Sequence, residues 1–182
     1  RDFSAQYSFL AEKPKDVGLE GYLFPDTYGV VRGENLEAII NKMLGNFDSK
    51  LSQEMREEIK RQKKSVFEIV TMASLIEKEV KTLEDKKIVS GILWKRLRSG
   101  IPLQVDSTIT YLQGKRTTEV FIKETQIDSP YNTYKYRGLP IAPIANPGLD
   151  SILASIYPKE SGYWFYLSTL EGKTIFSRNL SE

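Results

Sequence analysis

The sequence contains no cysteine and no histidine among its 182 residues. Their absence excludes disulfides, thiol nucleophiles, histidine-based catalytic triads and the usual zinc-ligand sets. Any catalytic group must therefore be Asp, Glu, Lys, Tyr, Ser or Thr, and we expect neither a metal ion nor a cofactor. The sequence also lacks a signal peptide and an apolar run long enough to span a membrane. Because it begins at Arg1 and not at Met, we interpret it as a fragment of a longer protein.

An excess of charge of either sign is missing as well. With 26 Lys and Arg against 24 Asp and Glu, the net charge is +2, which is too small to indicate a nucleic-acid partner. Lys95, Arg96 and Arg98 form one basic cluster on a predicted helix, where we expect them to point mostly outward. A nucleic-acid-binding module is therefore only a distant alternative. Hydrophobic residues make up 40% of the chain and charged residues 27%, as in globular proteins.

The length predicts one domain over residues 1–182, in which an aromatic N-terminal segment (1–33) packs on a core formed by residues 34–182. Spacing and capping residues predict three longer helices, over residues 36 to about 62 (interrupted near Gly45 or at FDSK), 66–80 and about 82–100. They also predict three short helices: one capped by Asp106 or Ser107, one within 120–127, and one capped by Asn146 with Pro147 in its first turn. Tyr163–Ser168 and Lys173–Arg178 predict a β-hairpin, and Leu19–Val31 predicts an edge strand or extended segment. The fold class is therefore α+β and mainly helical.

One of these helices, VFEIVTMASLIEKEV (Val66–Val80), carries a carboxylate where hydrophobes are expected. Ser65 and Glu68 form a capping-box pattern at its start. At about 100° per residue, Glu79 is turned further into the apolar face than Glu77. A carboxyl in apolar surroundings has a raised pKa and can stay protonated near neutral pH, as general-acid cleavage of a glycosidic bond requires. The periodicity alone also fits a salt bridge from Glu79 to a basic residue at the edge of a core helix.

Three further groups of side chains suit sugar binding. They are Gln104, Asp106 and Thr108; Tyr131, Asn132 and Tyr134; and Glu20 with Tyr28. Amides, carboxylates and hydroxyls can bind sugar hydroxyls or N-acetyl groups, and aromatic faces can stack on sugar C–H surfaces. Each group taken alone also fits an ordinary structural role: capping and turn chemistry, a surface loop held by tyrosines, and an edge strand.

The motifs TMASLIEKEV, KRLRSGIPLQVDSTITY and SPYNTYKYRGLPIAPIANPGLDSILASIYP occur in this order along the chain. They resemble the successive motifs of the MltG/YceG-like family of endolytic murein transglycosylases. LEGYLFPDTY and YWFYLS resemble an upstream motif and a late strand of the same family, so the resemblance covers about residues 19–180. It implies a lysozyme-like catalytic core. It also implies that the second glutamate of the EKE motif is catalytic, which is Glu79 here, the residue that the helix-face analysis also selects.

The resemblance implies cleavage of the bond between N-acetylmuramic acid and N-acetylglucosamine, with Glu79 acting first as acid and then as base to leave a 1,6-anhydro end. By analogy with other lytic transglycosylases, Gln104, Tyr131 and Asn132 would line the cleft. The family pattern often has Pro after the Asp of LQxDPT, where this chain has Ser107; this changes the rigidity of the turn and removes no catalytic group.

The resemblance further implies action on peptidoglycan strands at the extracytoplasmic face of the bacterial membrane, with peptidoglycan synthases (penicillin-binding proteins) as partners. Proteins of the family carry an N-terminal membrane helix and a LysM-like region, which this sequence does not contain. Two alternatives stay open. One is a lysozyme-type hydrolase with Asp106 or Asp26 as a second carboxylate. The other is a non-catalytic glycan-binding module that recruits cell-wall synthases.

Overall fold

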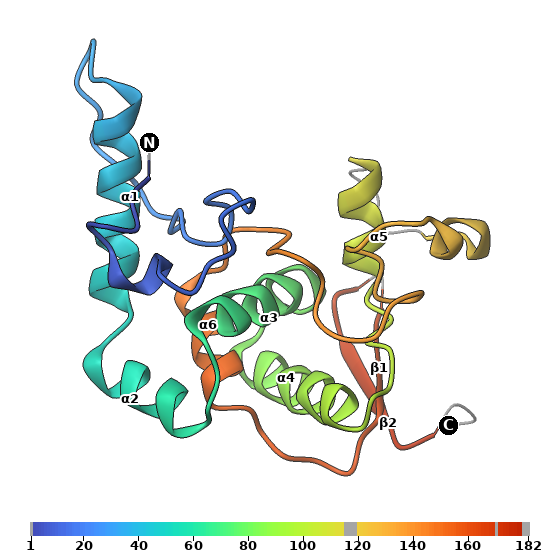
Figure 1. The fold of residues 1–182 in the computed structure, drawn as a ribbon. Helices are drawn as coiled ribbons and strands as arrows, with labels where there is room; N and C mark the ends of the chain where they lie inside the picture. Colours follow the sequence, from blue (N-terminus) through green and yellow to red (C-terminus); the bar gives the residue numbers. More distant parts are fainter. Residues whose placement is uncertain (1, 115–119, 170, 180–182) are drawn as a thin grey trace.

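The structure is a computed structural model and describes residues 2–114, 120–169 and 171–179 (Figure 1). Within these ranges it contains six α-helices, two 3₁₀ turns and one two-stranded sheet. The helices are α1 (Leu36–Lys50), α2 (Gln53–Arg61), α3 (Val66–Glu79), α4 (Leu83–Arg98), α5 (Asp106–Gln113) and α6 (Leu149–Ile156), and the 3₁₀ turns are η1 (Ser8–Leu10) and η2 (Ile122–Gln126). The prediction of a mainly helical α+β fold is confirmed.

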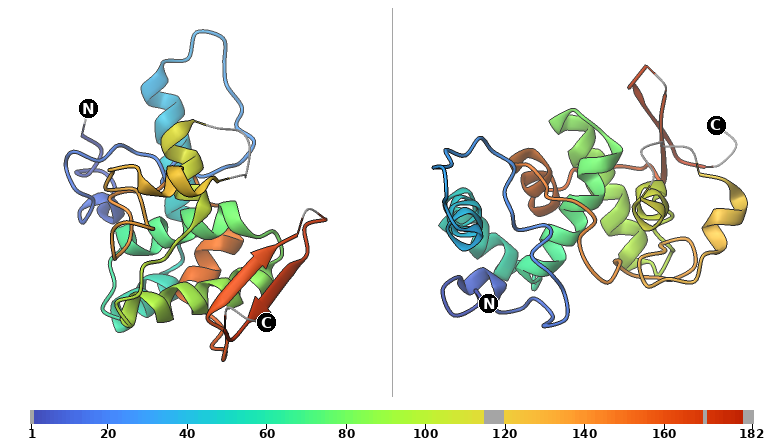
Figure 2. Two further views of the ribbon diagram at one scale, coloured as in Figure 1. Left: turned by 90° about the vertical axis from the view of Figure 1, so that its right-hand side faces the viewer. Right: turned by 90° about the horizontal axis from the view of Figure 1, so that it is seen from above.

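The central helix is α3, which packs against α6, α4, α5, α2 and η1 (Figures 1 and 2). Ile69, Met72 and Ile76 are fully buried, and burying one such side chain contributes about 1.5–3 kcal/mol. The predicted capping box is present: the Ser65 hydroxyl accepts from the Glu68 N–H, and the Glu68 carboxylate accepts from the Ser65 N–H. The packing of neighbours on most sides of α3 fixes the direction of its C-terminal end.

The long helix predicted over residues 36 to 62 is divided into α1 and α2, but the position of the break differs from one expectation. Gly45 lies inside α1, and the break falls at Leu51–Ser52, just after the FDSK stretch. Ser52 begins α2 by accepting a hydrogen bond from the Met55 N–H. A serine that can cap a new helix offers the backbone an alternative to continuing the old one, and that decides the break.

The N-terminal segment does not form a strand within its described residues. Residues 19–31 contain only turns, bends and irregular backbone. The role predicted for Asn146 is wrong. It does not cap α6, which Gly148 precedes without any side-chain cap. Its side-chain oxygen instead accepts from the Gly21 N–H at 2.7 Å and the Leu23 N–H at 3.2 Å. Asn146 therefore holds the N-terminal segment against the core.

Gly21 makes this close approach possible. Its φ of +96° lies in the left-handed region, and a Cβ there would lie 2.6 Å from a methyl group of Val70. A residue with a side chain would be strained by its backbone angle and would also collide with α3.

The expectation that the basic residues of α4 point mostly outward is wrong for Arg96. Its side chain is 7% exposed and donates to the Leu103 carbonyl and to Gln104 Oε1. The predicted capping of the next helix also differs, because α5 starts at Asp106 after Val105 and has no side-chain cap. A buried Arg thus shapes the loop that leads from α4 into α5.

The C-terminal hairpin is confirmed. Strands β1 (Phe165–Ser168) and β2 (Thr174–Ser177) pair in antiparallel register, with Tyr166 opposite Phe176. The hairpin and α5 lie at the end of the molecule opposite α1 (Figures 1 and 2). None of the helices in the described ranges has both the length and the apolar character to span a membrane.

Candidate active site

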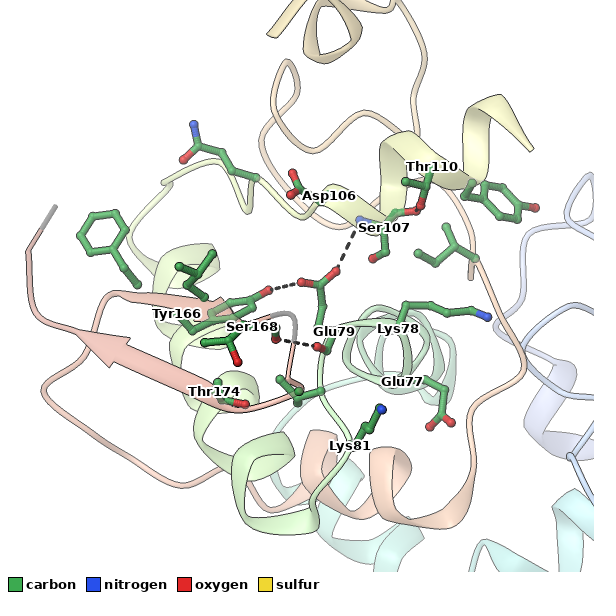
Figure 3. Close-up of a pocket in the computed structure, with 18 of the residues that line it drawn as sticks. Glu77, Lys78, Glu79, Lys81, Asp106, Ser107, Thr110, Tyr166, Ser168 and Thr174 are labelled. Carbon is green, nitrogen blue, oxygen red and sulfur yellow. Dashed lines mark hydrogen bonds between the residues drawn. The ribbon is translucent and has the colours of Figure 1, made fainter. Parts of the chain in front are cut away.

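A cavity of 1420 Å³ lies where the C-terminal end of α3, the start of α5 and strand β1 meet (Figure 3). Each of these elements contributes polar side chains to its wall. Glu79 comes from α3, Asp106 and Ser107 from α5, and Tyr166 and Ser168 from β1. Segments more than 80 residues apart in sequence therefore meet around one carboxyl group.

Glu79 is held by three hydrogen bonds at the cavity wall. The Tyr166 hydroxyl donates to its Oε2 at 3.1 Å, and the Ser107 N–H donates to its Oε1 at 3.4 Å (Figure 3). The Ser168 hydroxyl donates to its main-chain carbonyl at 3.1 Å. Among the described residues no Lys or Arg forms an ion pair with it, so the salt-bridge interpretation of Glu79 is not supported.

Burial raises the pKa of Glu79, and the negative charge of Asp106 raises it further. Hydrogen bonds from Ser107 and Tyr166 act in the opposite direction but do not cancel the effect of burial. A carboxyl with a raised pKa is the group that can hold a proton near neutral pH and still release it to a bound oxygen.

Glu77, two residues earlier on α3, has very different surroundings. It forms an ion pair with Lys86 at 3.1 Å and accepts hydrogen bonds from the Ser151 hydroxyl and the Gly148 N–H. Burial alone would raise its pKa, but these partners outweigh burial and lower it. Glu77 is therefore an ionised structural group that joins α3 to α4 and α6.

Three of the predicted binding residues line the same cavity as Glu79: Gln104, Asp106 and Tyr134. Gln104 is exposed, its φ is +53°, and its N–H donates to the Thr133 carbonyl at 3.0 Å. The Tyr134 hydroxyl donates to the Asp106 carboxylate. Amide, carboxylate and phenol groups at one cavity wall are suited to binding hydroxyl and acetamido groups.

Two predicted binding residues are buried supports of this wall and do not line the cavity. The side chain of Asn132 is 1% exposed; it donates to the Thr125 and Ile127 carbonyls and accepts from the Tyr134 N–H. The hydroxyl of Thr108, which is fully buried, donates to the Val105 carbonyl. Both side chains are hydrogen-bonded to nearby main-chain groups, and neither lines the cavity.

The remaining candidates lie at the margin of the cavity or away from it. Tyr131 packs on Tyr111, with 5.2 Å between ring centroids, and the Tyr111 hydroxyl donates to Glu20 at 2.6 Å. Tyr111 lines the cavity, so Tyr131 and Glu20 support its outer edge. Tyr28 donates to the Phe24 carbonyl in the N-terminal segment and does not line the cavity.

Tyr166, Ser168 and Arg96 were not found by the sequence analysis as parts of the site. The period-2 geometry of a strand places Tyr166 and Ser168 on the same face of β1, so a shared partner could have been expected. Nothing in the local pattern indicates that the partner is Glu79. In the described part of the chain no cluster of three or more acidic side chains is arranged to hold a metal ion.

Comparisons with known proteins place this geometry in context. The YceG-like family matches residues 3–182. A protein from Bacillus subtilis (strain 168) named endolytic murein transglycosylase is 40% identical over 165 residues, which are 90% of this chain and 46% of that protein. A protein of the same name from Streptococcus pneumoniae (D39) is 39% identical over 96% of this chain and 34% of its own length.

A solved structure is also similar. The crystal structure of a putative yceG-like protein from Listeria monocytogenes superposes with a TM-score of 0.87 at 36% sequence identity. The match covers 98% of this chain and 60% of the Listeria chain. The present chain therefore spans between about a third and three-fifths of the relatives that it matches.

Proposed function

Because the chain belongs to the YceG-like family, we propose that it is the catalytic part of an endolytic peptidoglycan lytic transglycosylase. The observation that carries the proposal is the position of Glu79: a carboxyl without a cationic partner among the described residues, at the wall of a 1420 Å³ cavity, with a pKa raised mainly by burial. The two matched proteins whose names state this activity add support.

The proposed reaction begins with Glu79 protonated. It donates its proton to the oxygen that links C1 of N-acetylmuramic acid to N-acetylglucosamine, and the C1–O bond breaks. The resulting carboxylate then takes the proton from the C6 hydroxyl of the same muramoyl residue, and that oxygen attacks C1. The product is a 1,6-anhydro end, no water is consumed, and Glu79 is again protonated. Intramolecular attack replaces a bimolecular step and can contribute several kcal/mol, up to about 7–11.

The other wall residues would orient the strand. Gln104, Asp106 and Tyr134 present polar groups on the α5 side of the cavity, and Phe165 and Leu167 from β1 also line it. We propose that the first three bind sugar hydroxyl and acetamido groups. We also propose that residues 1–182 act as one catalytic domain, with the N-terminal segment held against the core by Asn146.

The test is mass analysis of the products released from purified peptidoglycan by the wild type and by Glu79→Gln. The wild type should release fragments with anhydro ends, which are lighter than reducing ends by one water. The Gln variant should release them at least about 10²-fold more slowly, since it keeps the size of the side chain but cannot donate a carboxylic proton. Undiminished release by Glu79→Gln would overturn the proposal.

A second candidate is a hydrolase of lysozyme type, and one observation favours it. The Asp106 carboxylate lines the same cavity and is close enough to raise the pKa of Glu79, so it could act as the second carboxylate. Asp26 does not suit this role, because it lies in the N-terminal segment, where it accepts a hydrogen bond from Asn46 of α1, and it does not line the cavity. Reducing ends among the products would favour the hydrolase.

A non-catalytic glycan-binding module would release no product even from the wild type. For the longer protein we propose action outside the cytoplasm, since the substrate is the cell wall. Attachment through an N-terminal membrane helix and association with peptidoglycan synthases stay predictions from the family resemblance. A pull-down of membrane-extracted synthases with the full-length protein would test the latter.

A further inference from the structure

Strand β1 holds residue 79 at two points. The Tyr166 hydroxyl donates to the Oε2 atom of Glu79 at 3.1 Å, and the Ser168 hydroxyl donates to its main-chain carbonyl at 3.1 Å (Figure 3). The Tyr166 ring packs against the hydrophobic core, opposite Phe176 on β2. A donor that is fixed by packing in this way restricts the orientation of the Glu79 carboxyl group.

The other carboxyl oxygen faces Ser107 at the start of α5. Its hydrogen-bond donor is the Ser107 N–H at 3.4 Å, which is near the limit of a useful hydrogen bond. The Ser107 hydroxyl is buried at the same cavity wall; within the described residues it makes no hydrogen bond of good geometry, but it lies close enough to Glu79 to lower the pKa of that carboxyl. A buried hydroxyl rarely stays without a good hydrogen-bond partner. The Ser107 hydroxyl can therefore donate to Glu79 when that carboxyl becomes negatively charged.

The two contacts assign different roles to the two oxygens. Within the described residues, Glu79 Oε2 is the acceptor of the one hydrogen bond that the Tyr166 hydroxyl donates. If the carboxylic proton were on Oε2, it would donate to the Tyr166 oxygen, and the buried phenol O–H would then have no acceptor among the described residues, which is costly. The proton is therefore better placed on Oε1, the oxygen at the start of α5.

We propose that Tyr166 is a positioning residue that holds Glu79 through Oε2, so that Oε1 is the oxygen that exchanges the proton with the substrate. The Ser107 hydroxyl then donates to Oε1 once the proton has left. This inference rests on the proposed function of Glu79 and adds to it the direction of proton transfer. The leaving oxygen lies on the side of Ser107 and Asp106, and not on the side of the hairpin.

The proposal predicts how pH affects the reaction, because activity of the free enzyme requires protonated Glu79. The Asp106 carboxylate on α5 raises the pKa of Glu79, and the hydrogen bonds from Ser107 and Tyr166 lower it. The buried Arg96 on α4 acts on the Tyr134 and Tyr166 hydroxyls, and on α3 itself Glu77 is paired with Lys86. A hydrogen bond from Tyr166 stabilises the carboxylate, so its removal should raise the pKa of Glu79 and move the alkaline limb of the pH profile upward.

The experiment compares Tyr166→Phe with Tyr163→Phe as a matched control. Tyr163 precedes the same strand, stacks on Phe176 and does not line the cavity. Tyr166→Phe should move the alkaline limb of kcat/KM upward by about 1 pH unit, as expected for one lost hydrogen bond to a charged group. We expect kcat at the optimum to fall about tenfold because the acid is less well oriented. Tyr163→Phe should keep the wild-type profile.

Two measurements keep the test decisive if Tyr166→Phe is unstable. Ser107→Ala should move the limb in the same direction, since it removes a hydroxyl that lowers the pKa of Glu79. Titration of ¹³C-labelled glutamate carboxyls by NMR, with Glu79 assigned from the Glu79→Gln spectrum, follows the same shift in the protein without substrate and below its unfolding temperature.

The outcomes separate this inference from the proposed function. Undiminished activity in Glu79→Gln would remove both. A large loss of activity in Glu79→Gln together with an unchanged pH profile and an unchanged NMR titration in Tyr166→Phe would overturn the role of Tyr166 and leave the proposed function standing. A rate loss in Tyr166→Phe without any shift of the limb or of the titration would show a purely structural role and would also overturn the inference.

Discussion

The last turn of α3 carries two glutamates whose surroundings differ sharply. Glu77 faces α4 and α6, where Lys86, Ser151 and Gly148 bind its carboxylate. Glu79 faces α5 and the hairpin, where it meets neutral donors and the like charge of Asp106. The pKa of Glu77 is lowered and that of Glu79 is raised.

The difference shows that a chain can place a structural anion and a candidate acid two residues apart on one helix. Both side chains lose solvation on folding, and desolvation raises both pKa values. A cation beside Glu77 reverses this effect, whereas Glu79 has neutral partners that only reduce it. The elements that pack on each side of α3 therefore set the chemistry of each residue.

The largest expected effect is loss of activity in Glu79→Gln, with Glu77→Gln as the matched control. General-acid catalysis contributes about 10²–10⁴-fold, so the Glu79 variant should lose at least about 10²-fold in kcat. Glu77→Gln should stay within about tenfold of the wild type when assayed well below its unfolding temperature. Release of soluble fragments from labelled peptidoglycan measures both, and equal losses would remove the distinction between the two residues.

The second prediction concerns folding stability. Glu77→Gln should lower the free energy of unfolding at pH 7 by about 2 kcal/mol, because Lys86, with a side chain only 9% exposed, would lose its counter-ion. Urea unfolding measures the loss. In a double-mutant cycle with Lys86→Met the two changes should not be additive, because they remove the same ion pair. Full additivity would mean that the pair makes no contribution of its own.

The third prediction is that the two substitutions have opposite pH dependence. The raised pKa of Glu79 means that its contribution to stability is present below the unfolded-state value of about 4.5 and is lost as pH rises through the folded-state pKa. Glu79→Gln should therefore gain stability relative to the wild type as pH rises above about 4.5. For Glu77 the pKa is lowered, so its contribution is present at pH 7 and is lost as pH falls through the folded-state pKa.

Unfolding of both variants and of the wild type between pH 3 and pH 8 checks these signs. At pH 7 the free energy of unfolding should be lower than that of the wild type for Glu77→Gln and higher for Glu79→Gln. Both differences should become smaller toward low pH. Parallel curves for the two variants would contradict the assignment of opposite shifts.

The smallest expected effect is that of Asp106→Asn. Removing the like charge should lower the pKa of Glu79 and move the alkaline limb of kcat/KM downward by up to about 1 pH unit. Activity at the optimum should remain within about tenfold of the wild type, since the proposed reaction uses one carboxyl. A loss as large as that of Glu79→Gln would instead indicate that Asp106 is a second catalytic carboxylate.

Local sequence was a reliable guide where the determinants are a few residues apart. The capping box of Ser65 and Glu68, the helix face that carries Glu79 and the hairpin around Tyr166 were all predicted. The same local rules failed for Asn146, which follows an N-cap pattern but binds the N-terminal segment more than 120 residues away. They failed for Arg96 too, because a helical wheel does not show that a loop will fold back over a basic side chain.

Only part of the candidate site could be predicted, because local patterns show which side chains are polar but not where the folded chain brings them. Glu79 and the wall residues Gln104, Asp106 and Tyr134 were named from the sequence, and the structure brings them to one cavity. Asn132 was also named, but its side chain is hydrogen-bonded to main-chain carbonyls of its own loop.

By itself the sequence determined a chain without thiol or imidazole chemistry, a central amphipathic helix and a carboxyl on its apolar face. These properties depend on residue types and on the 3.6-residue period of one helix. Only the tertiary structure decided which glutamate meets a cation and which meets a phenol. That choice depends on Lys86, Ser151, Ser107 and Tyr166, which belong to other elements and reach α3 only when the chain packs.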